Sequence, residues 1–117
     1  MNDWQVVPRR RTIDGVKFRL HGKKGNKLNV YIGSGLKKRL KGYRPDSYCN
    51  IYSKGDNLMV QVVCVSDSNS RKLRGSVFSL PYSLVSKHWK DGAREIEIPA
   101  VVEKGNLILL DLRDLSK

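Results

Sequence analysis

The chain has 117 residues, and its 39% hydrophobic content is enough for the core of one small domain and excludes a fully disordered tail. It carries 23 Lys and Arg residues against 11 Asp and Glu, a formal net charge of +12 at pH 7. A charge of this size destabilises a compact fold by self-repulsion, which a polyanionic partner such as nucleic acid would relieve.

Several other classes of protein are disfavoured by what the sequence lacks. No segment approaches the ~18 apolar residues of a membrane span, and the N-terminus lacks the apolar run of a signal peptide, so we expect a soluble cytoplasmic protein. Cys49 and Cys64 lie in strand-like runs and are expected to be two buried thiols rather than a disulfide. His21 and His88 are isolated, so no zinc ligand set is predicted. Without a nucleophile elbow or a carboxylate pair in an apolar setting, we expect no enzyme, cofactor or metal.

The first 26 residues are expected to form a basic hairpin or arm. Asp14-Gly15 is a typical two-residue turn, which predicts a hairpin between segments 9–13 and 16–20. Glycines at both ends of the next segment, 21–26, predict a basic turn.

Residues 27–65 predict a strand, a short helix and a hairpin. Segment 28–32 alternates as a strand, Ser34 is expected to be the N-cap of a helical turn over 36–40, and strands 48–52 and 58–65 are joined by a tight loop. Because segment 58–65 is nearly all apolar, we expect that strand to be buried on both faces.

The second half repeats this order after a polar linker at 66–74. Residues 75–115 predict a strand at 77–80, a helix at 81–89 with Pro81 in its first turn, and a pair of strands at 94–98 and 107–112. Ile32 then matches Leu80, and Leu58 matches Leu107, although any two β-rich segments can be aligned to some degree. The interpretation favoured is one mostly β domain, a small pseudo-two-fold β-barrel with two short helices, built from two strand–helix–hairpin repeats.

The first repeat resembles the AbrB-type swapped-hairpin (SpoVT/AbrB-like) DNA-binding domain. The stretches that carry the resemblance are 30–32, 36–40, 44–46 and 48–62. The family's proline after the first strand is replaced by Gly33 here, whereas Leu80-Pro81 supplies it in the second copy. The resemblance implies an interwoven barrel formed by two unequal copies in one chain, with DNA contacts from Lys37, Lys38 and, less directly, Lys27.

The basic residues are concentrated in one part of the chain. Residues 1–45 hold 13 Lys and Arg against two Asp, whereas residues 46–117 hold 10 basic and nine acidic residues. The predicted nucleic-acid-binding residues are Lys37, Lys38, Arg39, Lys41, Arg44, Lys27, Lys23, Lys24, Arg9, Arg10, Arg11 and Arg19. The cluster at 37–44 also fits an ordinary solvated helix face, and the three arginines at 9–11 fit either a minor-groove arm or the end of a strand.

The function predicted from these patterns is binding of double-stranded DNA through its phosphates, as in a transcriptional regulator. One alternative is an RNA or single-strand binder on a small barrel, in which tyrosines of the basic half (Tyr31, Tyr43, Tyr48 and Tyr52) stack on bases. Those tyrosines also fit plain packing. The other alternative is a protein-interaction module or inhibitor, and a homodimer or partner contact through residues 75–115 is compatible with either function.

Overall fold

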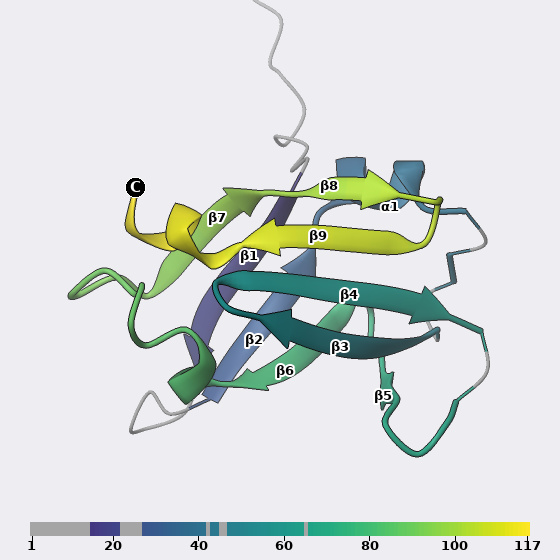
Figure 1. The fold of residues 1–117 in the computed structure, drawn as a ribbon, viewed down its shortest axis with the longest axis horizontal. Helices are drawn as coiled ribbons and strands as arrows, with labels where there is room; N and C mark the ends of the chain where they lie inside the picture. Colours follow the sequence, from purple (N-terminus) through teal and green to yellow (C-terminus); the bar gives the residue numbers. More distant parts are fainter. Residues whose placement is uncertain (1–14, 22–26, 42, 45–46, 65) are drawn as a thin grey trace, which may run out of the picture.

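The fold is a two-layer arrangement of antiparallel sheets, seen in a computed structural model that describes residues 15–21, 27–41, 43–44, 47–64 and 66–117 (Figure 1). One sheet has four strands in the order β6-β2-β1-β7, and the other has five in the order β5-β3-β4-β9-β8. We call them sheet A and sheet B. The elements are β1 (Gly15–His21), β2 (Lys27–Ile32), α1 (Ser34–Arg39), β3 (Tyr48–Lys54), β4 (Asn57–Val63), β5 (Arg71–Lys72), β6 (Val77–Pro81), the 3₁₀ turn η1 (Tyr82–Leu84), β7 (Glu95–Pro99), β8 (Val101–Glu103), β9 (Leu107–Asp111) and the 3₁₀ turn η2 (Leu112–Ser116).

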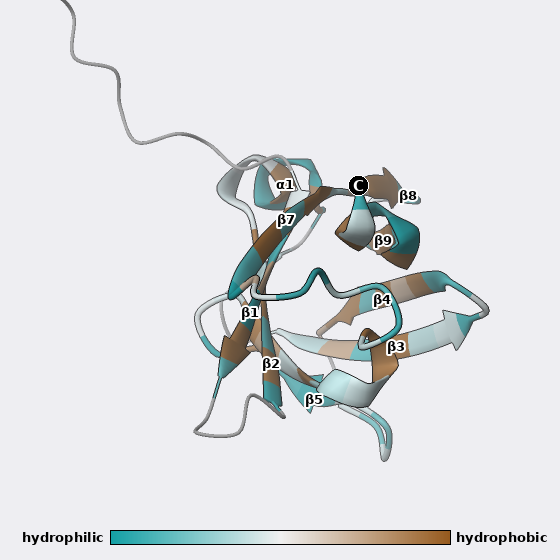
Figure 2. Cartoon of the chain, turned by 90° about the vertical axis from the view of Figure 1, so that its left-hand side faces the viewer, coloured by the Kyte–Doolittle hydropathy of each residue, from teal (hydrophilic) through white to brown (hydrophobic). Residues whose placement is uncertain are grey.

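The hydrophobic core lies between the two sheets. Alternate residues of each strand point inward, so that Phe18 and Val30 of sheet A and Val60 and Ile108 of sheet B are almost completely buried in one cluster. Figure 2 shows the two layers side by side, with β1, β2 and β7 in one and β3, β4 and β9 in the other. The mostly β fold expected from the sequence is therefore confirmed.

Strand pairing links distant parts of the chain. In sheet A, β2 pairs with β6 so that Val30 lies opposite Phe78, and β1 pairs with both β2 and β7. In sheet B, β4 forms a hairpin with β3 and pairs on its other side with β9. At Ala100 the chain leaves sheet A at the end of β7 and enters sheet B as β8, so one nearly continuous segment joins the two layers.

Three predicted features of this fold are wrong. The described residues form two separate sheets rather than a closed barrel. Segment 94–98 does not pair with 107–112, because β7 pairs with β1 while β9 pairs with β4 and β8. Gly15 is not a turn residue but the first residue of β1, opposite Pro99, where a Cβ would come within 2.0 Å of the Ile98 carbonyl oxygen. The other half of that predicted hairpin, 9–13, lies outside the described residues.

The two predicted helices differ in outcome. α1 forms in the expected place, but Ser34 is its first residue rather than its N-cap. The N-cap is Gly33, which has no side chain to cap the helix. The predicted helix at 81–89 is only the three-residue η1 followed by turns. Its sequence holds two serines, one valine and two aromatic residues among nine positions, and all of these are weak helix formers.

Burial also corrects two local predictions. Strand β4 alternates, with Leu58, Val60 and Val62 buried and the residues between them partly or fully exposed, so it is not buried on both faces. Cys49 is buried as expected, but Cys64 follows the strand and is exposed; both are free thiols.

Candidate nucleic-acid interface

Three of the predicted binding residues lie on the last turn of α1. We call Lys37, Lys38 and Arg39 the helix cations. Leu36, fully buried in the core, anchors this short helix, and the half-buried Lys37 and the exposed Lys38 and Arg39 follow it. Cations are favoured at a helix C-terminus because the last carbonyl groups carry partial negative charge.

Lys41 has a structural contact as well as a charge. Its backbone N–H donates to the Gly105 carbonyl at 2.8 Å, and a Cβ at Gly105 would lie 2.8 Å from Lys41 Cδ. The aliphatic part of Lys41 therefore packs over the β8–β9 turn and holds the helix exit against sheet B, as long basic side chains often do.

Arg44 brings the helix exit to a hollow that it shares with Lys72. The hollow has a volume of about 280 Å³ and is lined by Arg44, Ser47, Tyr48, Cys64 and Lys72. Ser47 joins the two segments, because its N–H donates to the Arg44 carbonyl at 3.0 Å and its carbonyl accepts from Leu73 N–H at 2.8 Å. Strand β5 adds to this connection by placing Lys72 opposite Tyr48.

A second, larger hollow adjoins the first. Its volume is about 460 Å³, and its lining residues are Asn29, Arg71, Lys72, Arg74, Val77, Phe78 and Ser79. Asn29 and Ser79 lie opposite each other on β2 and β6, and the Ser79 hydroxyl donates to Asn29 Oδ1 at 3.2 Å. The Arg71 guanidinium donates to the Ser79 carbonyl and so lies across the edge of β6.

The two hollows share Lys72 and form one basic surface, which we call the basic band: Arg44, Arg71, Lys72 and Arg74. All four residues are exposed. Among the described residues, no Asp or Glu lines either hollow. The acid nearest along the described chain, Asp67, is held by its own loop: hydrogen bonds from the Asn69 N–H, Ser70 and Asn50 lower its pKa. The band is therefore a local excess of positive charge.

The outer face of sheet A carries three more cations, of which Arg19 and Lys27 were predicted binding residues and Lys17 was not. Lys17, Arg19 and Lys27 alternate with inward-facing core residues on β1 and β2. Arg19 Nε lies 3.5 Å from Glu95, so part of its charge is balanced. Lys17 Nζ lies 5.1 Å from the centre of the Tyr31 ring, which places a cation beside an aromatic side chain on an open sheet face.

The structure thus brings together a different set of cations from the predicted one. Arg9, Arg10, Arg11, Lys23 and Lys24 lie outside the described residues. Sequence analysis missed Arg71, Lys72 and Arg74, because segment 66–74 was interpreted as a polar linker. The signal for this part of the surface was the run Arg71-Lys72-Leu73-Arg74, in which one buried leucine stands among three exposed cations.

The tyrosines proposed as base-stacking residues are dispersed over the molecule. Tyr31 is on sheet A, Tyr48 lines the smaller hollow, and the half-buried Tyr43 packs against the core with its hydroxyl bonded to Ser76. Tyr52 is the most exposed, at 46%, but it lies on the outer face of sheet B, away from the basic band.

The described residues show few features of other functional classes. No group of three or more His, Cys, Asp and Glu side chains there is placed to hold a metal ion, and no helix is long and apolar enough to cross a membrane. His88 does have a partner, Asp56, whose Oδ1 lies 2.8 Å from His88 Nε2. Burial raises the pKa of Cys49 to about 11 despite the nearby charge of Arg71, so this thiol stays protonated.

Comparison with known proteins gives no family assignment. No protein-family model, no curated protein and no solved structure matches this chain.

Proposed function

We propose that this protein binds nucleic acid through phosphate contacts made by the basic band. The observation that carries the proposal is that Lys72 lines both hollows and joins Arg44, from the first half of the chain, to Arg71 and Arg74 from the second. Four exposed cations without a lining carboxylate are suited to neutralise several neighbouring phosphates. The helix cations form a separate positive area, because the helix exit packs on the β8–β9 turn, whereas β5 lies at the opposite edge of sheet B.

The magnitude of the salt dependence follows from the number of cations. Each neutralised phosphate of B-DNA contributes about −0.9 to the slope of log K against log salt, so the basic band alone predicts a slope of about −3 to −4. Contacts by the helix cations would make the slope steeper. This steepness distinguishes phosphate binding from an apolar protein contact.

We further propose that the nucleic acid is duplex DNA and that binding serves transcriptional regulation, as the swapped-hairpin resemblance implies. The strand pairing supports a duplicated unit, β1–β4 followed by β5–β9. The equivalent strands β2 and β6 pair with each other, as do β4 and β9. In such a duplication β1 would be equivalent to β5, and β3 to β7. The pairing agrees with this, because β5 pairs with β3 just as β1 pairs with β7. The Arg74–Val77 bridge between β5 and β6 corresponds to the β1–β2 hairpin.

A fluorescence-anisotropy titration at low and high salt tests the proposal, with one duplex, its single strand and a matched RNA as probes. The test variant carries Arg44→Ala, Lys72→Ala and Arg74→Ala and should lower the salt slope by about 3. The control removes three cations that line neither hollow, Lys87, Lys90 and Lys117, and should change the slope less. Wild-type protein that binds none of the three probes at low salt would overturn the proposal.

A second candidate function is single-strand binding on the outer face of sheet A. It rests on Tyr31, which lies half-buried in the middle of that sheet beside Lys17 and Asn29. Base stacking on an aromatic ring contributes about 1–3 kcal/mol by alanine substitution. Tyr31→Ala should therefore weaken single-strand binding by about tenfold or more if this function is correct, and leave duplex binding nearly unchanged.

A further inference from the structure

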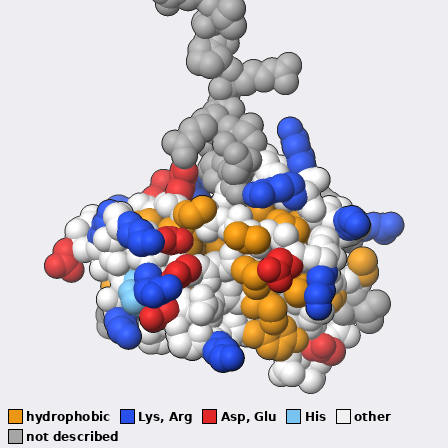
Figure 3. All heavy atoms as spheres, turned by 45° about the horizontal axis from the view of Figure 1, so that its top comes forward, with side chains coloured by type: hydrophobic (Ala, Val, Ile, Leu, Met, Phe, Trp, Pro, Cys, Tyr) orange, Lys and Arg blue, Asp and Glu red, His pale blue; other side chains and the backbone are white. Residues whose placement is uncertain are grey.

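The outer face of sheet B carries a row of apolar side chains that the nucleic-acid proposal does not use. Tyr52, Met59, Leu109 and Val101 lie directly opposite one another on β3, β4, β9 and β8. Tyr52 and Val101, at the two ends of this row, are 46% and 58% exposed. They are the large hydrophobic residues most open to solvent in the described part of the chain. Figure 3 shows hydrophobic side chains gathered in a band across this face.

The row forms the wall of an apolar groove of about 570 Å³. Leu58, Leu110 and Pro99 complete its apolar lining. Contiguous apolar surface of this kind marks a contact site more often than scattered exposed hydrophobic residues do. The groove contains two carboxylates, Asp111 and Asp114, and one cation, Lys54, so it is unsuited to a polyanion.

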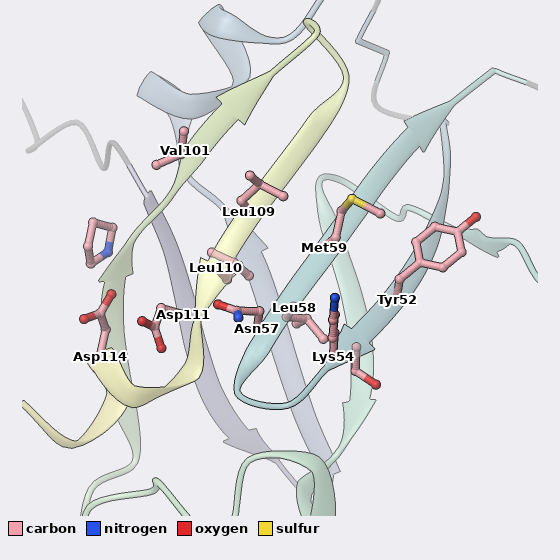
Figure 4. Close-up of a pocket in the computed structure, with 12 residues that line it drawn as sticks. Tyr52, Lys54, Asn57, Leu58, Met59, Val101, Leu109, Leu110, Asp111 and Asp114 are labelled. Carbon is pink, nitrogen blue, oxygen red and sulfur yellow. The ribbon is translucent and has the colours of Figure 1, made fainter.

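The charged groups lie in a second row beside the apolar one. Lys54 on β3, Asn57 on β4 and Asp111 on β9 are opposite one another in register. Figure 4 shows Lys54 and Asp114 on opposite sides of the groove, with Asn57 and Asp111 between them. One side of the groove therefore carries a cation. The other carries two carboxylates, each of which already has an ion-pair partner in the chain: Asp111 pairs with Arg113 at 2.8 Å and Asp114 with Lys117 at 3.0 Å.

We propose that this face binds a second copy of the same chain in a two-fold symmetric contact. A symmetric contact needs a self-complementary surface, because each residue meets its counterpart across the axis. With the axis parallel to the strands, between β4 and β9, Tyr52 of one copy meets Val101 of the other, and Met59 meets Leu109. The same operation places Lys54 of one copy against the acidic side of the other, where Asp114 lies.

The predicted dimer is weak. Four strands about 4.8 Å apart and about five residues long present a flat face of about 300 Å², below the roughly 800 Å² per partner of a standard interface. We therefore expect a dissociation constant at the upper end of the micromolar range, and salt should weaken the dimer less than it weakens nucleic-acid binding, because only the Lys54 contacts are ionic. The dimer does not depend on the proposed function, because the basic hollows are lined by residues other than those of the groove.

Sedimentation velocity of the full chain from about 1 to 200 µM measures this equilibrium. Met59→Glu should raise the dissociation constant by roughly 30-fold or more, as expected for a central residue of an interface. Val77→Glu is the matched control, since it places the same charge on a half-buried residue of sheet A and should leave the dimer intact.

A charge exchange tests the symmetry directly. Lys54→Glu sets like charges against each other across the axis and should dissociate the dimer without affecting the fold, because Lys54 is exposed. Asp114→Lys should also weaken it, and thermal melting would establish that this variant folds, since Asp114 pairs with Lys117 at 3.0 Å. An equimolar mixture of the two variants should dimerise again, because both opposed pairs are then of opposite sign.

Two outcomes would overturn the dimer. One is a wild-type chain that stays monomeric over the whole concentration range, whether the groove is then open or covered by another part of the chain. The other is a dimer that Met59→Glu and Lys54→Glu both leave intact, which would place the contact on another surface.

Discussion

Gly15 lies where β1 and β7 approach too closely for a side chain, and replacing it with alanine tests the sheet A register. The strand β1 passes so close to β7 that an added Cβ would lie 2.0 Å from the Ile98 carbonyl oxygen and 3.0 Å from the Pro99 Cα. Both neighbours are backbone atoms and cannot rotate away. The Gly15 carbonyl also accepts the Gly33 N–H at 2.9 Å, just before α1 begins.

The expected loss of stability comes from two effects. Overpacking at a site that cannot relax destabilises a protein by about 1–3 kcal/mol. Separating β1 from β7 at this end also weakens about one backbone hydrogen bond, a further loss of about 1 kcal/mol. Gly15→Ala should therefore lower the free energy of unfolding by about 2–4 kcal/mol, a decrease in Tm of roughly 8–16 °C for a chain of this size.

Urea unfolding followed by circular dichroism measures the change, with Gly75→Ala as the control. Gly75 has a φ of +60°, but an added Cβ would meet no atom within 4 Å, so only backbone strain of about 1–2 kcal/mol is expected there. A Gly15→Ala variant that loses less stability than Gly75→Ala would refute the close β1–β7 approach and return Gly15 to the turn suggested by the sequence.

Three further predictions concern charge and thiol chemistry. Alanine at all three helix cations should weaken binding to duplexes of any sequence by about tenfold or more at low salt, and unchanged anisotropy titrations of a folded variant would remove α1 from the interface. A hydrogen bond from His88 lowers the pKa of Asp56 in the folded protein below its ordinary 3.8. The ionised Asp56 therefore stabilises the fold above pH 3.8, and this contribution is lost as the pH falls through the lower folded-state pKa. Urea titrations from pH 6 to pH 3 should therefore show the wild type losing its advantage over Asp56→Asn; a constant difference would count against the pair. A thiol reagent should modify the exposed Cys64 rapidly and Cys49, with its pKa of about 11, only on unfolding; two fast-reacting thiols would contradict the burial of Cys49.

Local patterns predicted the strands more successfully than their partners. Alternation of apolar residues located β1 and β7, short apolar runs located β2, β3, β4, β6 and β9, and the glycine turn between β3 and β4 located their hairpin. The pairing of β7 with β1 was not predictable in this way, because it joins segments nearly 80 residues apart. The Asp14-Gly15 signal failed for a related reason: glycine is also required where two backbones approach closely, and sequence alone does not separate the two uses.

The candidate site shows the same division between local and distant information. The helix cations and Arg44 were identified from their density in the sequence, and the structure places them along α1 and its exit. Arg71, Lys72 and Arg74 were overlooked because segment 66–74 was interpreted as a polar linker, within a second half of the chain that is nearly neutral when its charges are summed. Their importance comes from β5, a two-residue strand whose pairing with β3 brings Lys72 beside Arg44.

Phosphate binding and contact between chains make opposite demands on charge, and the molecule meets them with two different surfaces. Phosphate binding requires solvated cations without neighbouring carboxylates, as in the basic band, whereas contact between chains that each carry a net charge of +12 requires a face with few charges and both signs. The outer face of sheet B provides the second surface, whereas the basic band lies at the β5 edge of the same sheet and on the neighbouring segments that hold Arg44 and Arg74. Because the groove and the two hollows share no lining residue, a dimer formed through the groove leaves both basic bands free. A duplex long enough to reach both bands would bind with higher apparent affinity than a short one. A duplex-length dependence that disappears with Lys54→Glu, while the salt slope on short duplexes is kept, would tie the two surfaces together as parts of one binding protein.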